Sequence, residues 1–132
     1  MKVLGMIIAS LHDFKNVKYH CTQSNENVAI INVEDKTLPV ILAVSDTQIT
    51  VFCNLFHINE VKPEHNLDLL QDMHRMNLPL NLSSFSQSGE YHIIFGALSI
   101  DSSMHQIEEE ITTLIDNAEE SLLTFEKYLI LE

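Results

Sequence analysis

The longest regular alternation of apolar and polar positions lies in the last third of the chain. From Ile107 to Leu129, apolar residues recur at steps of three and four, with acidic residues between them. This is the periodicity of an amphipathic helix. Ser103, followed three residues later by Gln106, forms a capping-box pattern that marks a helix start. We therefore predict a helix over 103–128 whose apolar face lies across a sheet.

The segment before this helix, residues 90–99, has apolar residues on both of its alternating faces. Two apolar faces are typical of a strand that is covered on both sides, by the domain or by another subunit. Phe95 and Leu114 are therefore expected in the core. Gly96 indicates a bulge or a close backbone approach. The turn chemistry before the strand predicts that residues 80–86 pair with it as a hairpin.

The first half of the chain predicts one helix and four strands. Residues 3–14 fit one face of a helix, although a strand is a competing interpretation of this apolar start. Short apolar or alternating segments then follow one another, separated by turn residues. Their short connections predict an antiparallel meander. The four predicted strands are 17–23, 28–33, 38–44 and 48–56.

A second helix is predicted after Pro63, over residues 64–76. Its expected apolar stripe contains Leu67, Leu70 and Met73. The whole pattern gives the order α-ββββ-α-ββ-α, which is an α+β fold with an antiparallel sheet and a long C-terminal helix packed on it. At this length we expect one domain over 1–132.

The net charge of −12 argues against nucleic acid or an anionic membrane as a direct ligand, because both require basic patches. Residues 101–132 hold nine acids and one base, which is −8 of that total. One interpretation is a solvated helix face. The other is an acidic docking surface for a basic protein partner. The candidate residues for such a partner-binding acidic face are Glu108, Glu109, Asp116, Glu119 and Glu120.

No catalytic, cofactor or metal site is predicted. The seven histidines form no HxH, HxxxH or HExxH pattern, and Cys21 and Cys53 have no zinc-ligand spacing. Reduced, buried thiols in a cytoplasmic protein are expected, with a disulfide as the alternative in an oxidising compartment. The apolar start lacks a cleavage site of signal-peptide type, and no apolar run has the length of a membrane span.

The chain ends in an apolar cluster, Tyr128, Leu129, Ile130 and Leu131. Together with the two-sided strand 90–99, this cluster predicts a homodimer that buries the apolar surface about a two-fold axis. The alternative is a monomer in which the tail folds back on its own sheet.

Two sequence features carry a resemblance to a known family. They are Leu78-Pro79-Leu80 and Tyr91-x-x-x-Phe95-Gly96-Ala97-Leu98-Ser99 before an acidic helix. Here the chain resembles a bacterial family catalogued as domain of unknown function 2170. That resemblance implies an accessory role in envelope stress, because its members tend to be encoded beside phage-shock-protein-A-like proteins. The element order is also similar to that of type III secretion chaperones, small acidic dimers that bind a partner protein.

Two function classes follow. The first is a non-catalytic adaptor or chaperone-like module that binds a protein, and the family resemblance implies a phage-shock-protein-A-like one. The second is a small-molecule-binding sensor or an unrecognised enzyme, which a deep pocket with converging polar groups would favour.

Overall fold

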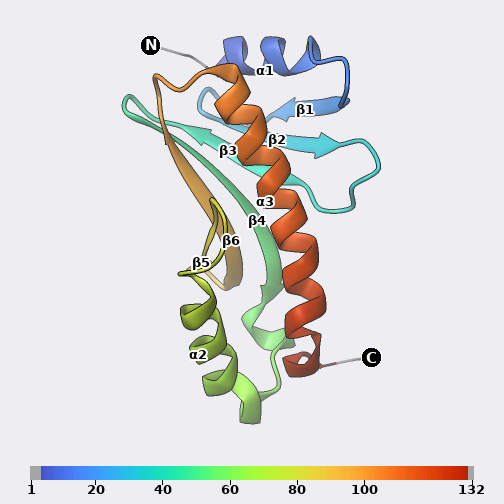
Figure 1. Cartoon of the computed structure of the whole chain (residues 1–132), viewed down its shortest axis with the longest axis vertical. Coiled ribbons are helices and arrows are strands. Elements are labelled where there is room, and N and C mark those ends of the chain that lie inside the picture. The colour runs from blue at the N-terminus through green and yellow to red at the C-terminus, as the bar shows by residue number, and fades with distance from the viewer. Residues whose placement is uncertain (1–3, 131–132) are drawn as a thin grey trace.

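The computed structural model describes residues 4–130 as one antiparallel sheet with helices packed against it (Figure 1). The strand order in the sheet is β1-β2-β3-β4-β6-β5. The strands are β1 Tyr19–Gln23, β2 Val28–Val33, β3 Val40–Val44, β4 Gln48–His57, β5 Ser84–Ser88 and β6 Tyr91–Ser99.

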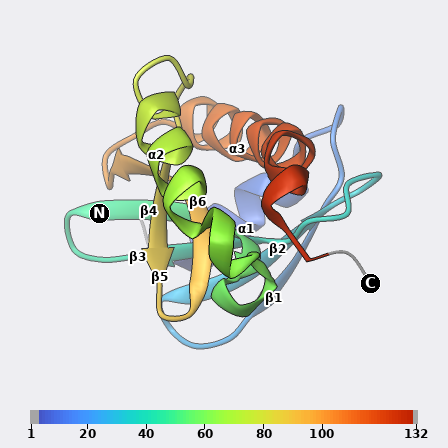
Figure 2. The ribbon, with the colours of Figure 1, turned by 90° about the horizontal axis from the view of Figure 1, so that it is seen from below.

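Three α-helices and three short 3₁₀ turns complete the fold. Helix α3 crosses the sheet, whereas α1 and α2 lie at opposite ends of the molecule (Figures 1 and 2). The predicted order of elements and the α+β class are therefore confirmed. The helices are α1 Leu4–His12, α2 Asn66–Met76 and α3 Met104–Phe125, and the turns are η1 Ile58–Glu60, η2 Pro63–His65 and η3 Glu126–Tyr128.

Helix α3 begins where its capping box predicts. The Ser103 hydroxyl accepts a hydrogen bond from the Gln106 backbone N–H at 3.2 Å, and the Ser103 N–H donates to the Gln106 side chain at 2.8 Å. Two of the otherwise unpaired donors of the first turn are thereby satisfied. Ile107, Ile111 and Leu114 are fully buried on the side that faces the sheet, so the expected core position of Leu114 is confirmed.

The two faces of the sheet differ, and this corrects the prediction for strand 90–99. Ile94 of β6 is fully buried on the α3 side, whereas Phe95 on the other face is only partly buried. The expectation of Phe95 in the core is therefore wrong within the chain, although Ile93 on the same face is buried. Cover of this face by another subunit stays a prediction. The helices that contact the sheet pack against the α3 side, so most alternate positions of the strands remain partly accessible.

A register shift in β4 changes the face on which its last residues lie. The pairing of β4 with β6 jumps between Asn54 and Phe56. A strict alternation from Ile49 would place Phe56 on the open face, but Leu55 and Phe56 are both buried. An irregularity of this kind moves one residue of a strand to the other side.

The apolar stripe predicted for the second helix is also wrong in part. The residues of α2 that face the protein are Leu69 and Met73, which are buried. Leu67 and Leu70 are instead exposed, at 66% and 43% of their surface. Helix α2 thus has buried apolar residues on one side and exposed ones on another, and the exposed Leu70 borders a cavity with Phe85 and His92.

The C-terminal segment is bonded to the loop that precedes α2. The Lys62 N–H donates to the Tyr128 carbonyl at 2.9 Å, and the Ile130 N–H donates to the Glu60 carbonyl at 2.7 Å. Val61 and Leu129 form an antiparallel bridge between these hydrogen bonds. The tail therefore folds back along its own chain through Ile130.

Candidate interaction surfaces

The acidic residues of α3 are the first candidate surface, and part of it is already engaged within the chain. Glu108 accepts a hydrogen bond from the Tyr19 hydroxyl at 3.0 Å. Lys36 lies 3.3 Å from Asp116 and 3.6 Å from Glu119. The hydrogen bond and charge of Asp116 raise the Lys36 pKa. Three of the five predicted residues are thus held by the protein itself.

The other two predicted acidic residues, Glu109 and Glu120, are exposed. Within residues 4–130, neither side chain makes a hydrogen bond or an ion pair. Glu109 and Glu120 are eleven residues apart, close to three helical turns, so they lie along one side of α3. They leave two carboxylates about 16 Å apart along the axis, at ~1.5 Å per residue, that are available to a basic partner.

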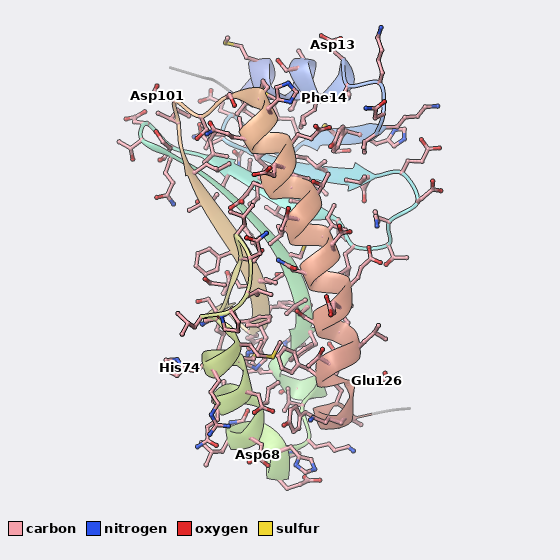
Figure 3. The ribbon with its side chains drawn as sticks, in the orientation of Figure 1. Asp13, Phe14, Asp68, His74, Asp101 and Glu126 are labelled. Carbon is pink, nitrogen blue, oxygen red and sulfur yellow. The ribbon has the colours of Figure 1, made fainter. Side chains whose placement is uncertain are left out.

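A second candidate surface is apolar and lies on α2. Leu67, Leu70 and His74 follow one another at steps of three and four, which places them on one side of α2, and Leu78 lies in the turn that follows the helix. Leu78 is 93% exposed, and His74 is exposed as well. We name these four residues the α2 outer face. Figure 3 shows His74 and Asp68 at the end of the molecule opposite Asp13 and Phe14.

The predicted dimer surface meets the same end of the molecule. Tyr128 is buried, and its hydroxyl donates a hydrogen bond to the Asp72 carboxylate of α2, which raises the Tyr128 pKa. Leu129 is partly buried, whereas Ile130 is 47% exposed. Leu131 lies outside the described residues. Ile130 lines a shallow cavity with Ile58 and other residues of the loop before α2.

The open face of the sheet is the third candidate surface. None of the six described strands contains Asp, Glu, Lys or Arg, so the charges of this acidic chain lie in its helices and connections. The register aligns four large apolar residues in one row across this face, and all four are partly buried. The row consists of Ile30, Ile41, Phe52 and Phe95.

One acidic residue of α3 has an unexpected position. Glu110 is only 4% exposed and faces β6, where a Cβ atom added to Gly96 would lie 2.1 Å from its Oε1 atom. Gly96 is thus required for the close approach of this carboxyl, which explains the glycine in the strand. Burial raises the Glu110 pKa, and the adjacent Glu109 charge raises it further.

Sequence reasoning missed Glu110, although a signal was present. Glu110 follows Ile107 by three residues and precedes Leu114 by four, which places it on the apolar side of the helix. A carboxyl on the apolar side of a helix and a glycine inside the strand before that helix are an unusual combination. Together they indicate that Glu110 and Gly96 pack against each other.

Burial affects one of the two cysteines and one of the histidines most strongly. Both thiols are free, and burial raises the Cys53 pKa to about 12. Burial also lowers the pKa of His92, which is enclosed between the sheet and α2. Among residues 4–130, no group of three or more His, Cys, Asp and Glu side chains could hold a metal ion.

A cavity of about 480 Å³ lies beside α3 at the β1 end of the sheet. Its charged lining is mixed, because Lys15, Lys18 and Lys36 are balanced by Glu34, Asp35 and Asp116. Lys36 and Asp116 already bond to each other there. The cavity is open to solvent and lacks a buried polar group that converges on a ligand. In the part of the chain that the structure describes, no helix is long and apolar enough to cross a membrane.

The arrangement of these elements matches a known class of fold. The chain is similar to a chain of the solved ExsC–ExsE complex, with a TM-score of 0.53 and 10% sequence identity over 90% of both chains. At this identity the likeness concerns the fold alone. It confirms the predicted type III secretion chaperone-like fold.

Sequence comparison then identifies the family. The model of the family described as "Uncharacterized protein conserved in bacteria (DUF2170)" matches residues 6–129, so the chain belongs to this family. The chain is also 34% identical over 98 residues to "Uncharacterized protein YjfI" of Escherichia coli strain K12. The YjfI protein of Escherichia coli O157:H7 has the same identity, and the match covers 72% of this chain and 74% of each relative.

Proposed function

We propose that this chain is a non-catalytic adaptor or chaperone-like module that binds a protein partner in the cytoplasm and acts as a homodimer. The observation that carries the proposal is the exposed acidic side of α3. Its Glu109 and Glu120 carboxylates have no partner among residues 4–130, in a fold similar to that of a chain from a protein–protein complex.

The charge of this surface selects a basic partner. Carboxylates along a helix attract a segment rich in Lys or Arg, accelerate its association and disfavour acidic competitors. Lys36 holds Asp116 and Glu119 in place beside the free pair. A basic ligand that binds Asp116 and Glu119 more tightly than Lys36 does could displace this lysine and pair with both carboxylates. A phage-shock-protein-A-like protein, which the family resemblance implies, is the first candidate.

The test compares two variants of equal net charge in affinity capture from native lysate. Glu109→Gln, Asp116→Asn and Glu120→Gln together remove three charges from the acidic side of α3. Glu26→Gln, Glu34→Gln and Asp46→Asn remove three exposed charges elsewhere. We expect the unaltered chain and the second variant to capture the same proteins, and the first variant to lose them.

The same set of chains is then titrated with purified phage-shock-protein-A-like protein at low and raised salt. Binding through the acidic surface should weaken as salt screens it. If the first variant captures and binds as well as the unaltered chain, the acidic side of α3 is not the partner site.

The volume of the mixed-charge cavity is the one observation on which a second candidate function, a small-molecule sensor, rests. A volume of about 480 Å³ is within the ~300–1,000 Å³ range of ligand sites. Thermal-shift screening against anionic and zwitterionic metabolites, with Lys18→Ala as the control, tests it. A ligand whose stabilisation disappears in Lys18→Ala would support the sensor.

A further inference from the structure

Among the described residues, Lys36 is the only basic side chain that forms an ion pair with an acid of α3. It lies in the connection from β2 to β3, 80 residues before Asp116 in the chain. Its Nζ atom lies 3.3 Å from Asp116 Oδ1 and 3.6 Å from Glu119 Oε1. Asp116 is in line with Glu109 and Glu120, because steps of seven and four residues are close to whole helical turns. The protein therefore holds one of its own lysines where a basic partner would bind.

The backbone of Lys36 is fixed by a turn, so only its side chain has to move to leave α3. The Lys36 N–H donates to the Val33 carbonyl at 3.1 Å, and the Glu34 N–H donates to the Lys18 carbonyl at 3.0 Å. Asp35, in the same turn, has a left-handed conformation with φ at 69°. Rotation of the lysine side chain would therefore uncover the acids without disturbing the sheet.

Lys36 leaves these acids incompletely hydrogen-bonded. The Oε1 atom of Glu119 is buried, and within the described part of the chain it accepts no hydrogen bond. A buried acceptor without a hydrogen bond is costly. The ammonium of a lysine is a compact point charge, whereas the guanidinium of an arginine carries five N–H donors in a planar fork. An arginine at this place can hydrogen-bond Asp116 and Glu119 together, which Lys36 does not.

The surroundings of Lys36 leave room for such an arginine. Lys36 and Asp116 both line the solvent-open cavity of about 480 Å³ beside α3. The Lys36 side chain is 37% exposed and the Asp116 side chain 67%. Ion pairs with this exposure are weak, because water and salt screen them. A ligand that enters from the cavity can therefore displace the lysine.

We propose that Lys36 is a built-in competitor that occupies the acidic side of α3 until an arginine of the protein partner displaces it. The arginine bonds Asp116 and Glu119, and the Lys36 side chain turns into solvent. This inference rests on the proposed function, and it narrows the basic segment of the partner to one that carries arginine. Lysine-rich segments are disfavoured, because they exchange one ammonium for another and gain no hydrogen bond.

The strength of the internal contact sets the size of the effect. A competitor lowers the apparent affinity of a ligand by the fraction of molecules in which the site is free. An exposed ion pair favours the occupied form by only a few fold. Removal of the Lys36 amine should therefore tighten partner binding by about two- to sixfold.

Carbodiimide cross-linking of the full chain tests the internal contact itself. This reagent joins an amine to a carboxylate that touches it and leaves guanidinium groups unreacted. Mass spectrometry should find Lys36 joined to Asp116 or Glu119 in the free chain. An N-acetylated peptide in which Arg alternates with Ser should suppress this link. A free chain without the link, or a bound peptide that leaves the link unchanged, would contradict the proposal.

Fluorescence polarisation with the same peptide, labelled, measures the competition at low salt. Lys36→Gln should bind it about two- to sixfold more tightly than the unaltered chain. Lys36→Arg should bind it more weakly, because an arginine at this position holds both carboxylates itself. The matched control is Lys15→Gln, which removes the same charge from the same cavity but breaks no ion pair within the described residues. Circular dichroism confirms that each variant is folded.

The outcomes separate the competitor from the partner site. Equal affinities of Lys36→Gln and Lys15→Gln would overturn the competitor alone, as would weaker binding by Lys36→Gln than by the unaltered chain. A peptide of alternating Lys and Ser that binds as tightly as the arginine peptide would overturn the preference for arginine. If no chain binds the arginine peptide, the proposed partner site fails. It also fails if the triple variant of Glu109, Asp116 and Glu120 binds the peptide as well as the unaltered chain does, and the competitor fails with it.

Discussion

Helices α2 and α3 both carry regular apolar residues, but they differ in how the protein uses them. In α3, the apolar positions from Ile107 to Phe125 are buried almost throughout, with Leu123 as the exposed exception. In α2, Leu69 and Met73 are buried, while Leu67 and Leu70 on another side are exposed. The sheet covers the apolar side of α3, whereas the side of α2 that carries Leu67 and Leu70 stays exposed.

This difference shows what an apolar spacing means. Regular spacing indicates that a helix side is removed from water, but it does not say whether the same molecule or another one covers it. Helix α3 lies over β4 and β6, where the sheet supplies Val51, Cys53 and Ile94 as fully buried neighbours. Helix α2 lies at one end of the molecule, where no further strand among residues 4–130 covers its exposed side (Figure 1).

The largest expected effect is in α3. Leu114→Ala should lower the free energy of unfolding by about 2–5 kcal/mol, because Leu114 is fully buried and its removal leaves a cavity. Phe95→Ala, on the open face of the sheet, should cost clearly less. Denaturant titration of both variants measures the difference. If both variants lose the same free energy of unfolding, the open face of the sheet must be covered in solution. The contrast between the buried side of α3 and the open face would then fail.

The next effect concerns the contact between α3 and β6. In Gly96→Ala, the new methyl group would lie 2.1 Å from Glu110 Oε1 and 3.1 Å from the Leu82 carbonyl oxygen. Overpacking of this kind costs about 1–3 kcal/mol. The loss should be smaller when Glu110→Ala is added, because the nearer clash disappears while the Leu82 contact remains.

Gly5→Ala is the matched control for this substitution. Gly5 lies within α1, and apart from the backbone of its own helix no atom of residues 4–130 approaches within 4 Å of the position that its Cβ would take. Alanine in a helix interior is more favourable than glycine by roughly 0.8–1 kcal/mol. Gly5→Ala should therefore stabilise the protein. An equal destabilisation by both alanines would show that the Glu110 contact is not the cause.

A third prediction concerns pH. A carboxyl whose pKa is raised by folding binds its proton more tightly in the native state. Its contribution to stability is therefore full at low pH and is lost as the pH rises from 4.5 through the raised value. In Glu110→Gln this loss is absent. The variant should gain stability relative to the parent chain between acid and neutral pH, on the order of 1 kcal/mol.

Unfolding titrations at several pH values between acid and neutral measure this difference. Glu26→Gln, at an exposed position, serves as the control and should show no such trend. A parent and Glu110→Gln pair whose stabilities stay parallel with pH would indicate that Glu110 is solvated in solution.

The sequence predicts the order of elements, the capped start of α3 and its buried side, because these depend on local spacing. It fails where tertiary packing decides between two equally apolar alternatives. Phe95 and Ile94 are adjacent and both apolar, and only the position of α3 determines which one is buried. The same holds for Leu69 against Leu70 in α2.

The candidate surfaces show the same limit. The acidic residues of α3 could be named from the sequence, but the Lys36 contacts that engage Asp116 and Glu119 join segments about 80 residues apart. Tyr128 of the predicted dimer surface is likewise held by Asp72, at a distance of 56 residues along the chain. No local pattern reports such pairs.

The smallest expected effect returns to α2. Because Leu67 is 66% exposed, Leu67→Ala should change the stability of the monomer by no more than about 0.5 kcal/mol. Denaturant titration of this variant beside Leu114→Ala measures the difference between the two helices. If Leu67→Ala costs as much as Leu114→Ala does, then Leu67 already packs within the molecule and the contrast between the two helices fails.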